Sequence, residues 1–215
     1  MVYHFNNLDY SIGVKRVRRL MRLMGLQAIY QAPKTSDPNP QHKIYPYLLR
    51  NMIIDRVNQV WCTDITYIRM KKGFLYLIAI MDWYSRKVLS WQLSNTMQNK
   101  FCIDTLNNAL NQYGTPEIFN TDQGSQFTSN EFTQLLLSKD IKVSMDGKGA
   151  WRDNVFIERL WRSLKYQCVY LHEFADGWEA RDKIGQWIEH YNNQRPHSFH
   201  KGLTPDTIFN LQRAA

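Results

Sequence analysis

Three carboxylates in the sequence occupy positions from which they could act together. Asp64 interrupts an apolar stretch with strand character, Asp122 follows a short apolar segment, and Glu158 lies within a helical pattern. A charge inside a sheet is costly unless it is paired or bound to a cation. Strand, strand end and helix can converge on one point, where three carboxylates would hold hard divalent cations through oxygen.

Such a site would suit phosphodiester chemistry. Mg²⁺ and Mn²⁺ prefer oxygen ligands to imidazole or thiolate. Two ions about 3.5–4 Å apart would activate a water or hydroxyl and stabilise the leaving oxygen. Each acid alone also has a plainer interpretation: Asp64 as an edge-strand residue facing solvent, Asp122 as a turn former and Glu158 as a surface residue. The chemistry therefore depends on their convergence.

The elements that must position these acids follow residue 57. Apolar and aromatic stretches predict strands over 59–68, 74–81, 87–93, 117–121 and 141–145. Helical patterns cover 99–113, 130–138, 153–171 and 178–191, and Thr204-Pro205 has the character of an N-cap and first helical position. The order βββαβαβ predicts an α/β fold with a mixed five-stranded sheet flanked by helices.

Charge and composition narrow the class of protein. The chain carries 27 Lys and Arg against 19 Asp and Glu, a formal net charge of +8, which favours a polyanionic partner such as nucleic acid. No apolar run approaches the ~18–20 residues of a spanning helix, and the N-terminus lacks a signal-peptide pattern. We expect a cytoplasmic protein with no membrane partner. No P-loop motif is present, so no nucleotide cofactor is expected.

The N-terminal part is predicted to be separate from the main domain. Residues 1–30 are expected to form a small basic helical extension, with Ser11 capping and Gly25 ending a helix. Its cations could contact DNA phosphates or simply face water; they are Lys15, Arg16, Arg18, Arg19 and Arg22. Residues 31–56, with four prolines, predict a linker or extended arm, which leaves 57–215 as the main domain.

Five segments in a fixed order carry a resemblance to a known family. They are VWCTDITY (60–67), MDWYSR (81–86), TDQGSQF (121–127), DNVFIER (153–159) and YNNQRPH (191–197). Together with the 35 residues that separate Asp122 from Glu158, they make the sequence resemble the DDE recombinases of the retroviral-integrase superfamily. More narrowly, it resembles bacterial insertion-sequence transposases whose enzyme is made by fusing two overlapping reading frames.

The resemblance implies a fold, a site and a reaction. The fold would be RNase H-like, and Asp64, Asp122 and Glu158 would be the catalytic triad that binds Mg²⁺ or Mn²⁺, as two ions. The reaction would be metal-dependent cleavage at the element's end, followed by attack of the freed 3′-hydroxyl on target DNA. The partners would be double-stranded DNA and further copies of the chain, at the bacterial nucleoid.

Further residues could hold DNA near this triad. Arg162 and Lys165 lie four and seven residues after Glu158, so they share its helical face; the alternative is a Glu158–Arg162 surface pair. Lys148, between two glycines, could clamp a DNA end or be an exposed loop lysine. Asn154 is expected to cap the helix.

Three features are given structural interpretations. Asp82 and Arg86 are expected to form an ion pair or turn, and the 191–197 segment is assigned to packing. His197 and His200 are expected at the surface. Two other functions remain open: an RNase H-like nuclease acting on hybrids or branched DNA, and a non-catalytic, DNA-binding regulatory fragment of a transposase.

Overall fold

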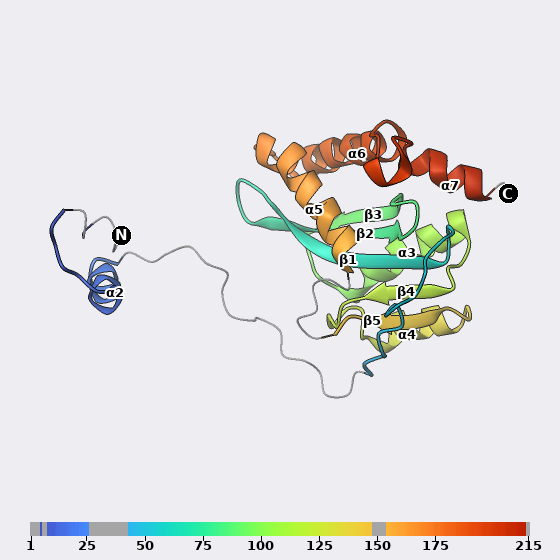
Figure 1. Cartoon of the computed structure of the whole chain (residues 1–215), viewed down its shortest axis with the longest axis horizontal. Helices are drawn as coiled ribbons and strands as arrows, with labels where there is room; N and C mark the ends of the chain where they lie inside the picture. The colour runs from blue at the N-terminus through green and yellow to red at the C-terminus, as the bar shows by residue number, and fades with distance from the viewer. Residues whose placement is uncertain (1–4, 6–7, 26–42, 148–153, 214–215) are drawn as a thin grey trace. The chain divides into compact units, whose positions relative to one another are not determined.

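The computed structural model describes residue 5 and residues 8–25, 43–147 and 154–213, and the chain divides into two compact units, 1–37 and 38–215 (Figure 1). The first unit contains helix α2 (Val14–Leu23). This helix begins after Gly13, which offers no side-chain cap, so the expected cap at Ser11 is wrong. It ends at Leu23 with Met24 as the C-cap, and Gly25 follows at φ 68°, a left-handed conformation that favours glycine.

The second unit is built on a mixed five-stranded sheet in the order β3-β2-β1-β4-β5, which confirms the predicted α/β fold. Strands β1 (Val60–Arg69), β2 (Phe74–Asp82) and β3 (Val88–Ser94) form an antiparallel meander. β4 (Ile118–Thr121) and β5 (Lys142–Met145) run parallel to β1. Parallel neighbours need long crossovers, and the helices between β3 and β5 supply them.

Helices cover both faces of the sheet (Figure 1). Helices α3 (Asn99–Tyr113) and α4 (Asn130–Leu137) pack on one face, and Phe209 of α7 (Pro205–Arg213) joins their cluster. Helices α5 (Val155–Gln167) and α6 (Gly177–Asn193) pack on the other face. The helix predicted over 153–171 therefore ends at Gln167, and a separate 3₁₀ turn, η2 (Val169–Leu171), follows it; a second such turn is η3 (Ser198–His200).

Strand alternation divides the core into two layers. Val60, Cys62 and Ile68 of β1 point into the α5/α6 layer, whereas Trp61 points into the α3/α4 layer. Both layers bury their β1 side chains fully: Cys62 and Trp61 have no exposed surface. Because both faces are covered, β1 is a nearly continuous apolar run in which a carboxylate stands out.

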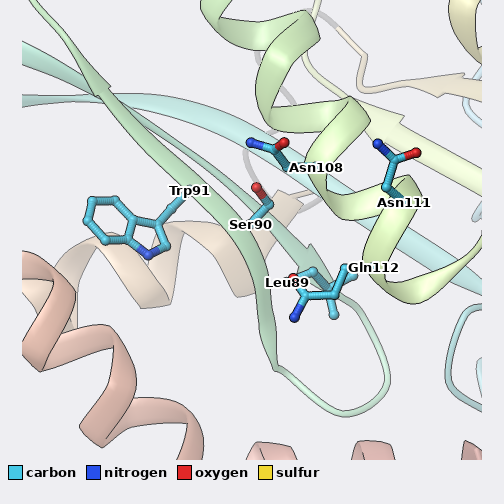
Figure 2. Close-up of a pocket in the computed structure, with 6 residues that line it drawn as sticks. All are labelled: Leu89, Ser90, Trp91, Asn108, Asn111 and Gln112. Carbon is cyan, nitrogen blue, oxygen red and sulfur yellow. The ribbon is translucent and has the colours of Figure 1, made fainter.

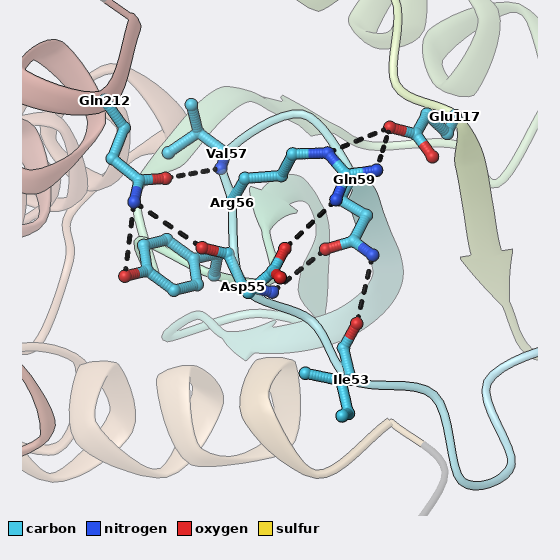
Figure 3. Close-up of polar contacts among 8 residues, drawn as sticks. Ile53, Asp55, Arg56, Val57, Gln59, Glu117 and Gln212 are labelled. Carbon is cyan, nitrogen blue, oxygen red and sulfur yellow. Dashed lines mark hydrogen bonds and ion pairs between the residues drawn. The ribbon is translucent and has the colours of Figure 1, made fainter. Parts of the chain in front are cut away.

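The segment that leads into β1 packs against the second unit. The backbone N–H of Leu48 donates to Ser144 Oγ (3.0 Å), and Leu49 is buried. Closer to β1, Arg56 forms an ion pair with Glu117 (2.7 Å), and Gln212 of α7 accepts from the Val57 N–H (3.1 Å; Figure 3). The described part of the predicted linker, residues 43–56, is thus an extended arm on this unit.

No helix within the described ranges is long and apolar enough to cross a membrane.

Candidate metal centre

Asp64 lies on the central strand β1, two residues beyond its last pair with β4, and its side chain contacts helix α5. β1 is flanked by β2 and β4, so the interpretation of Asp64 as an edge-strand residue is wrong. Alternation places its side chain on the face of Val60, Cys62 and Ile68. There Asp64 Oδ2 accepts a hydrogen bond from Trp161 Nε1 (2.8 Å), one helical turn after Glu158.

Asp122 is brought beside Asp64 by the parallel pairing of β1 and β4. Cys62 lies opposite Asn120, and Asp64 and Asp122 each follow two residues later, on the same face. Asp122 Oδ1 accepts from the backbone N–H of Gly124 (2.9 Å). A Cβ at position 124 would lie 2.9 Å from this oxygen, so a larger residue there would displace the carboxylate from its present position.

Glu158 lies in the first turn of α5 and is exposed. The start of this helix is tied to β1 by Asn154, whose Nδ2 donates to the carbonyl of Thr63 (3.1 Å), the residue before Asp64. Asn154 therefore does not cap the helix with its side chain as expected. Its Oδ1 is buried and has no hydrogen-bond partner within the described structure.

The pKa values of the two aspartates reflect this convergence. Burial and the charges of Asp122 and Glu158 together raise the pKa of Asp64 to about 7, against the hydrogen bond from Trp161. Loss of solvation also raises the pKa of Asp122, although the residue keeps exposed surface, while the bond from the Gly124 N–H lowers it. Three carboxylates from a strand, a strand end and a helix thus share one electrostatic environment.

The donors fit a hard divalent cation in chemistry, although not in their present rotamers. In the described part of the chain no three His, Cys, Asp or Glu side chains lie close enough to hold an ion. Two carboxylate oxygens bond instead to Trp161 and to the Gly124 N–H. The raised pKa values and the orphaned Asn154 Oδ1 are what a cation with oxygen ligands would relieve.

Asp146, which no motif in the sequence marks, is buried at the end of β5. Its Oδ1 accepts from Asn120 Nδ2 (2.8 Å), and its carbonyl accepts from Gln123 Nε2 (2.8 Å). These bonds hold the strand end and the loop that carry Asp122. The available signal was positional, because Asp146 follows β5 as Asp122 follows β4.

The predicted DNA-binding cations lie on α5, on α2 and outside the described residues. Arg162 is exposed and Lys165 half-buried on the α5 face of Glu158, and neither forms an ion pair with a described residue, so the alternative Glu158–Arg162 pair is absent there. Lys15, Arg16 and Arg19 are exposed on α2. Lys148 lies outside the described residues.

Asp82 is a turn former rather than a metal ligand. Its Oδ1 accepts from the backbone N–H and the hydroxyl of Ser85 (2.7 and 2.6 Å), and its Oδ2 from the Asn58 N–H (2.8 Å). The backbone N–H of Arg86 closes the turn onto the Asp82 carbonyl (3.0 Å). Of the two interpretations offered for this segment, the structure shows the turn.

An open groove of about 510 Å³ lies elsewhere, between β3 and α3 (Figure 2). Its polar side chains are Ser90 of the strand and the neutral amides Asn108, Asn111 and Gln112 of the helix. No titratable side chain lines it among the described residues. It therefore lacks the groups that the carboxylate site offers.

Comparison with known proteins places this site in a family. Models of the integrase core domain match residues 55–150 and 139–205. The transposase of insertion sequence element IS904 from Lactococcus lactis is 35% identical over 90% of this chain and 79% of its own length. The chain belongs to the insertion-sequence transposases.

Other transposase and integrase chains agree with this assignment. Transposase InsF for insertion sequence IS3A from Escherichia coli K12 is 31% identical over 95% of this chain and 73% of its own length. The HTLV-2 integrase catalytic core domain, solved in complex with magnesium, matches 71% of this chain and 95% of its own at 26% identity and a TM-score of 0.52.

One solved structure shows the fold alone. A chain of the simian T-cell lymphotropic virus intasome matches 80% of this chain with a TM-score of 0.64 at 21% identity, and this chain spans 60% of its length. The predicted RNase H-like fold and the resemblance to integrase-type transposases are confirmed. The chain is the catalytic region of a transposase, a polynucleotidyl transferase.

Proposed function

We propose that Asp64, Asp122 and Glu158 are the catalytic triad of this transposase, which cleaves DNA at the element's end and joins the freed 3′-hydroxyl to target DNA. The observation that carries the proposal is the convergence of the three carboxylates. The charges of Asp122 and Glu158 both raise the pKa of Asp64, although the three residues come from separate elements.

The triad would hold Mg²⁺ or Mn²⁺, as two ions. Bound there, the metal supplies activation of the attacking water or hydroxyl and stabilisation of the leaving oxygen. The rest of the task belongs to the chain's own residues. Trp161 orients Asp64, Asn154 fixes the start of α5 to β1, and Gly124 leaves room for the Asp122 carboxylate. Catalysis of this kind is mostly positioning and electrostatics.

Double-stranded DNA is the proposed substrate, with both element ends held by several copies of the chain. Arg162 and Lys165 lie on the α5 face of Glu158, where they can neutralise phosphates beside the reacting bond. Lys148 and the α2 residues Lys15, Arg16 and Arg19 are proposed as further contacts. Guanidinium and ammonium groups suit this role because they pair with phosphate without needing a particular base.

The test is strand transfer of a labelled oligonucleotide that carries the element's own end, with Mg²⁺ or Mn²⁺. Joined product is expected with the unaltered chain and should fall below detection in Glu158→Gln and when EDTA removes the metal. Glu131→Gln is the matched control, because Glu131 is an exposed glutamate in the first turn of another helix, α4. It should join DNA as the unaltered chain does.

The alternatives predict other products. Cleavage without joining by the unaltered chain would favour a nuclease. Tight, metal-independent binding without turnover in any of the proteins would favour a regulatory fragment. Joining that survives Glu158→Gln would contradict the assigned triad.

A further inference from the structure

A cavity of about 410 Å³ lies on a different face of α5 from the proposed triad. Phe156, Arg159 and Ser163 line it from α5, spaced three and four residues apart along one side of the helix. Glu158, Arg162 and Lys165 occupy another side. The remaining wall comes from the β2–β3 turn and from the 191–199 segment, whose chemistry the triad leaves unused.

The wall carries three guanidinium groups from three separate parts of the chain: Arg86, Arg159 and Arg195. No described residue that lines the cavity is acidic, and none of the three arginines forms an ion pair within the described structure. Arg86 donates to the Trp83 carbonyl and lies over the Phe156 ring, and Arg195 donates to Gln167 Oε1 (2.9 Å). These partners are neutral, so Asp82, which attracts Arg86 from outside the cavity, offsets only part of the positive charge.

His197, also in the wall, responds to that charge. It is not a simple surface histidine as expected, because its Nε2 is buried and lacks a hydrogen-bond partner in the described structure. Burial, and after it the positive charges of Arg195, His200 and Arg86, lower the pKa of His197 to about 4. A neutral ring thus lies in the wall of a positively charged cavity, which favours an anion as its ligand.

We propose that this cavity binds a phosphate of the DNA backbone, held by Arg159 and Arg195 with a hydrogen bond from Ser163, beside the His197 ring. The identity of the anion as DNA rests on the proposed function. Arg159 directly follows Glu158 in α5. When the reacting phosphate of a DNA strand lies at Glu158, neighbouring phosphates of the same strand can therefore lie near Arg159. Phe199, 67% exposed in the cavity wall, offers a ring to the sugar or base next to the phosphate.

The first measurement is the salt dependence of DNA binding by the full chain, without divalent metal or phosphate buffer. Arg159→Gln and Arg195→Gln are each compared with Arg181→Gln, which removes one exposed arginine of α6 outside the cavity. Each cavity variant should weaken binding of a 30-base-pair duplex about threefold to tenfold near 0.1 M salt. The slope of log K against log salt should become shallower by about 0.9. Arg181→Gln should stay within about twofold.

A second measurement keeps the proposal testable if a variant folds poorly. The His197 ring resonances, assigned by their loss in His197→Gln, should shift when a short single-stranded oligonucleotide is added to the unaltered chain. Shifts with inorganic phosphate but not with the oligonucleotide would overturn the assignment to DNA. Unchanged affinity and slope in both arginine variants, with thermal unfolding unaltered, would overturn the site.

The two proposals fail separately. If the arginine variants bind DNA normally while Glu158→Gln still abolishes joining, the cavity proposal fails and the triad stands. If the unaltered chain joins no DNA, yet the arginine variants bind more weakly and with a shallower slope, the triad proposal fails and the cavity stands.

Discussion

Among single residues, Asp64 has an environment that disfavours the charged form of its carboxylate. It occupies an apolar face of β1 beside two other carboxylates, with Trp161 as its hydrogen-bond donor. Its pKa of about 7 in the folded chain lies above the ordinary value, so folding favours the protonated form. The ionised Asp64 carboxylate therefore lowers the free energy of unfolding, while it adds a negative charge to the site.

The sign of this effect gives a pH dependence. Between the ordinary pKa of about 4 and the folded value of about 7, the folded state binds more protons than the unfolded state, so the free energy of unfolding falls as pH rises. Asp64→Asn removes this effect while keeping an oxygen for Trp161. In EDTA, the variant should have a Tm about 2–4 °C above the unaltered chain at pH 8, and the difference should vanish near pH 4.

Asp140→Asn is the control for this experiment, because Asp140 is an exposed aspartate in the turn between α4 and β5. Its Tm difference should stay close to zero at both pH values. An Asp64→Asn chain less stable than the unaltered one at pH 8 would contradict the unfavourable charge at this position.

Among the elements, each edge strand of the sheet is covered at one point by another part of the chain. The arm before β1 lies against the β5 edge, where the Met145 N–H donates to the Pro46 carbonyl (3.4 Å). At the β3 edge, the carboxamide of Asn192 in α6 accepts from the Val88 N–H and donates to the Val88 carbonyl, both at 2.9 Å. Such cover prevents an exposed edge from pairing with other chains.

Asn192 therefore acts as one residue of an additional strand, and its removal should loosen α6 from the sheet. Asn192→Ala leaves both backbone groups of Val88 without this partner in a buried position. The free energy of unfolding in urea should fall by about 1–3 kcal/mol. Asn193→Ala, next along the helix and exposed, should change it by less than about 0.5 kcal/mol. Equal effects of the two substitutions would contradict the role given to Asn192.

The two hydrogen bonds between Asn192 and Val88 refine the assignment of the 191–197 segment to packing. Asn192 packs as predicted, whereas Tyr191, Arg195 and His197 line the cavity proposed to bind phosphate. The sequence segment is continuous, but successive residues of a helix end face different surroundings.

At the scale of the whole molecule, the basic helix and the catalytic unit are compact separately. The cations of α2 contribute to the net charge of +8 without a carboxylate in the first turn of their helix. We predict that substitution of Lys15, Arg16 and Arg19 together by Gln leaves the Tm unchanged, because all three side chains are exposed.

The same triple substitution should weaken DNA binding. The slope of log K against log salt should become shallower by about 0.9 for each phosphate that the chain no longer neutralises, as measured by fluorescence anisotropy with a duplex. An unchanged slope would mean that these cations face water, which is the alternative that the sequence left open.

The sequence by itself determined the elements and the class of chemistry. Alternating and helical apolar patterns are local, and they predicted five strands and the helix Asn99–Tyr113 at its observed bounds. The spacing of Asp64, Asp122 and Glu158, with the motifs around them, indicated the family before any contact was known.

Which side chains meet depends on contacts between distant parts of the chain. The Trp161 bond to Asp64, the Asn154 bond to Thr63 and the Asp146 network join residues 20 to 100 positions apart, and no local pattern records such pairs. Asn154 occupies the N-cap position of α5, but its side chain bonds to Thr63 instead of capping, because the fold brings that competing partner near. The arginine cavity has the same origin, since its charges come from three distant segments and only packing makes them neighbours.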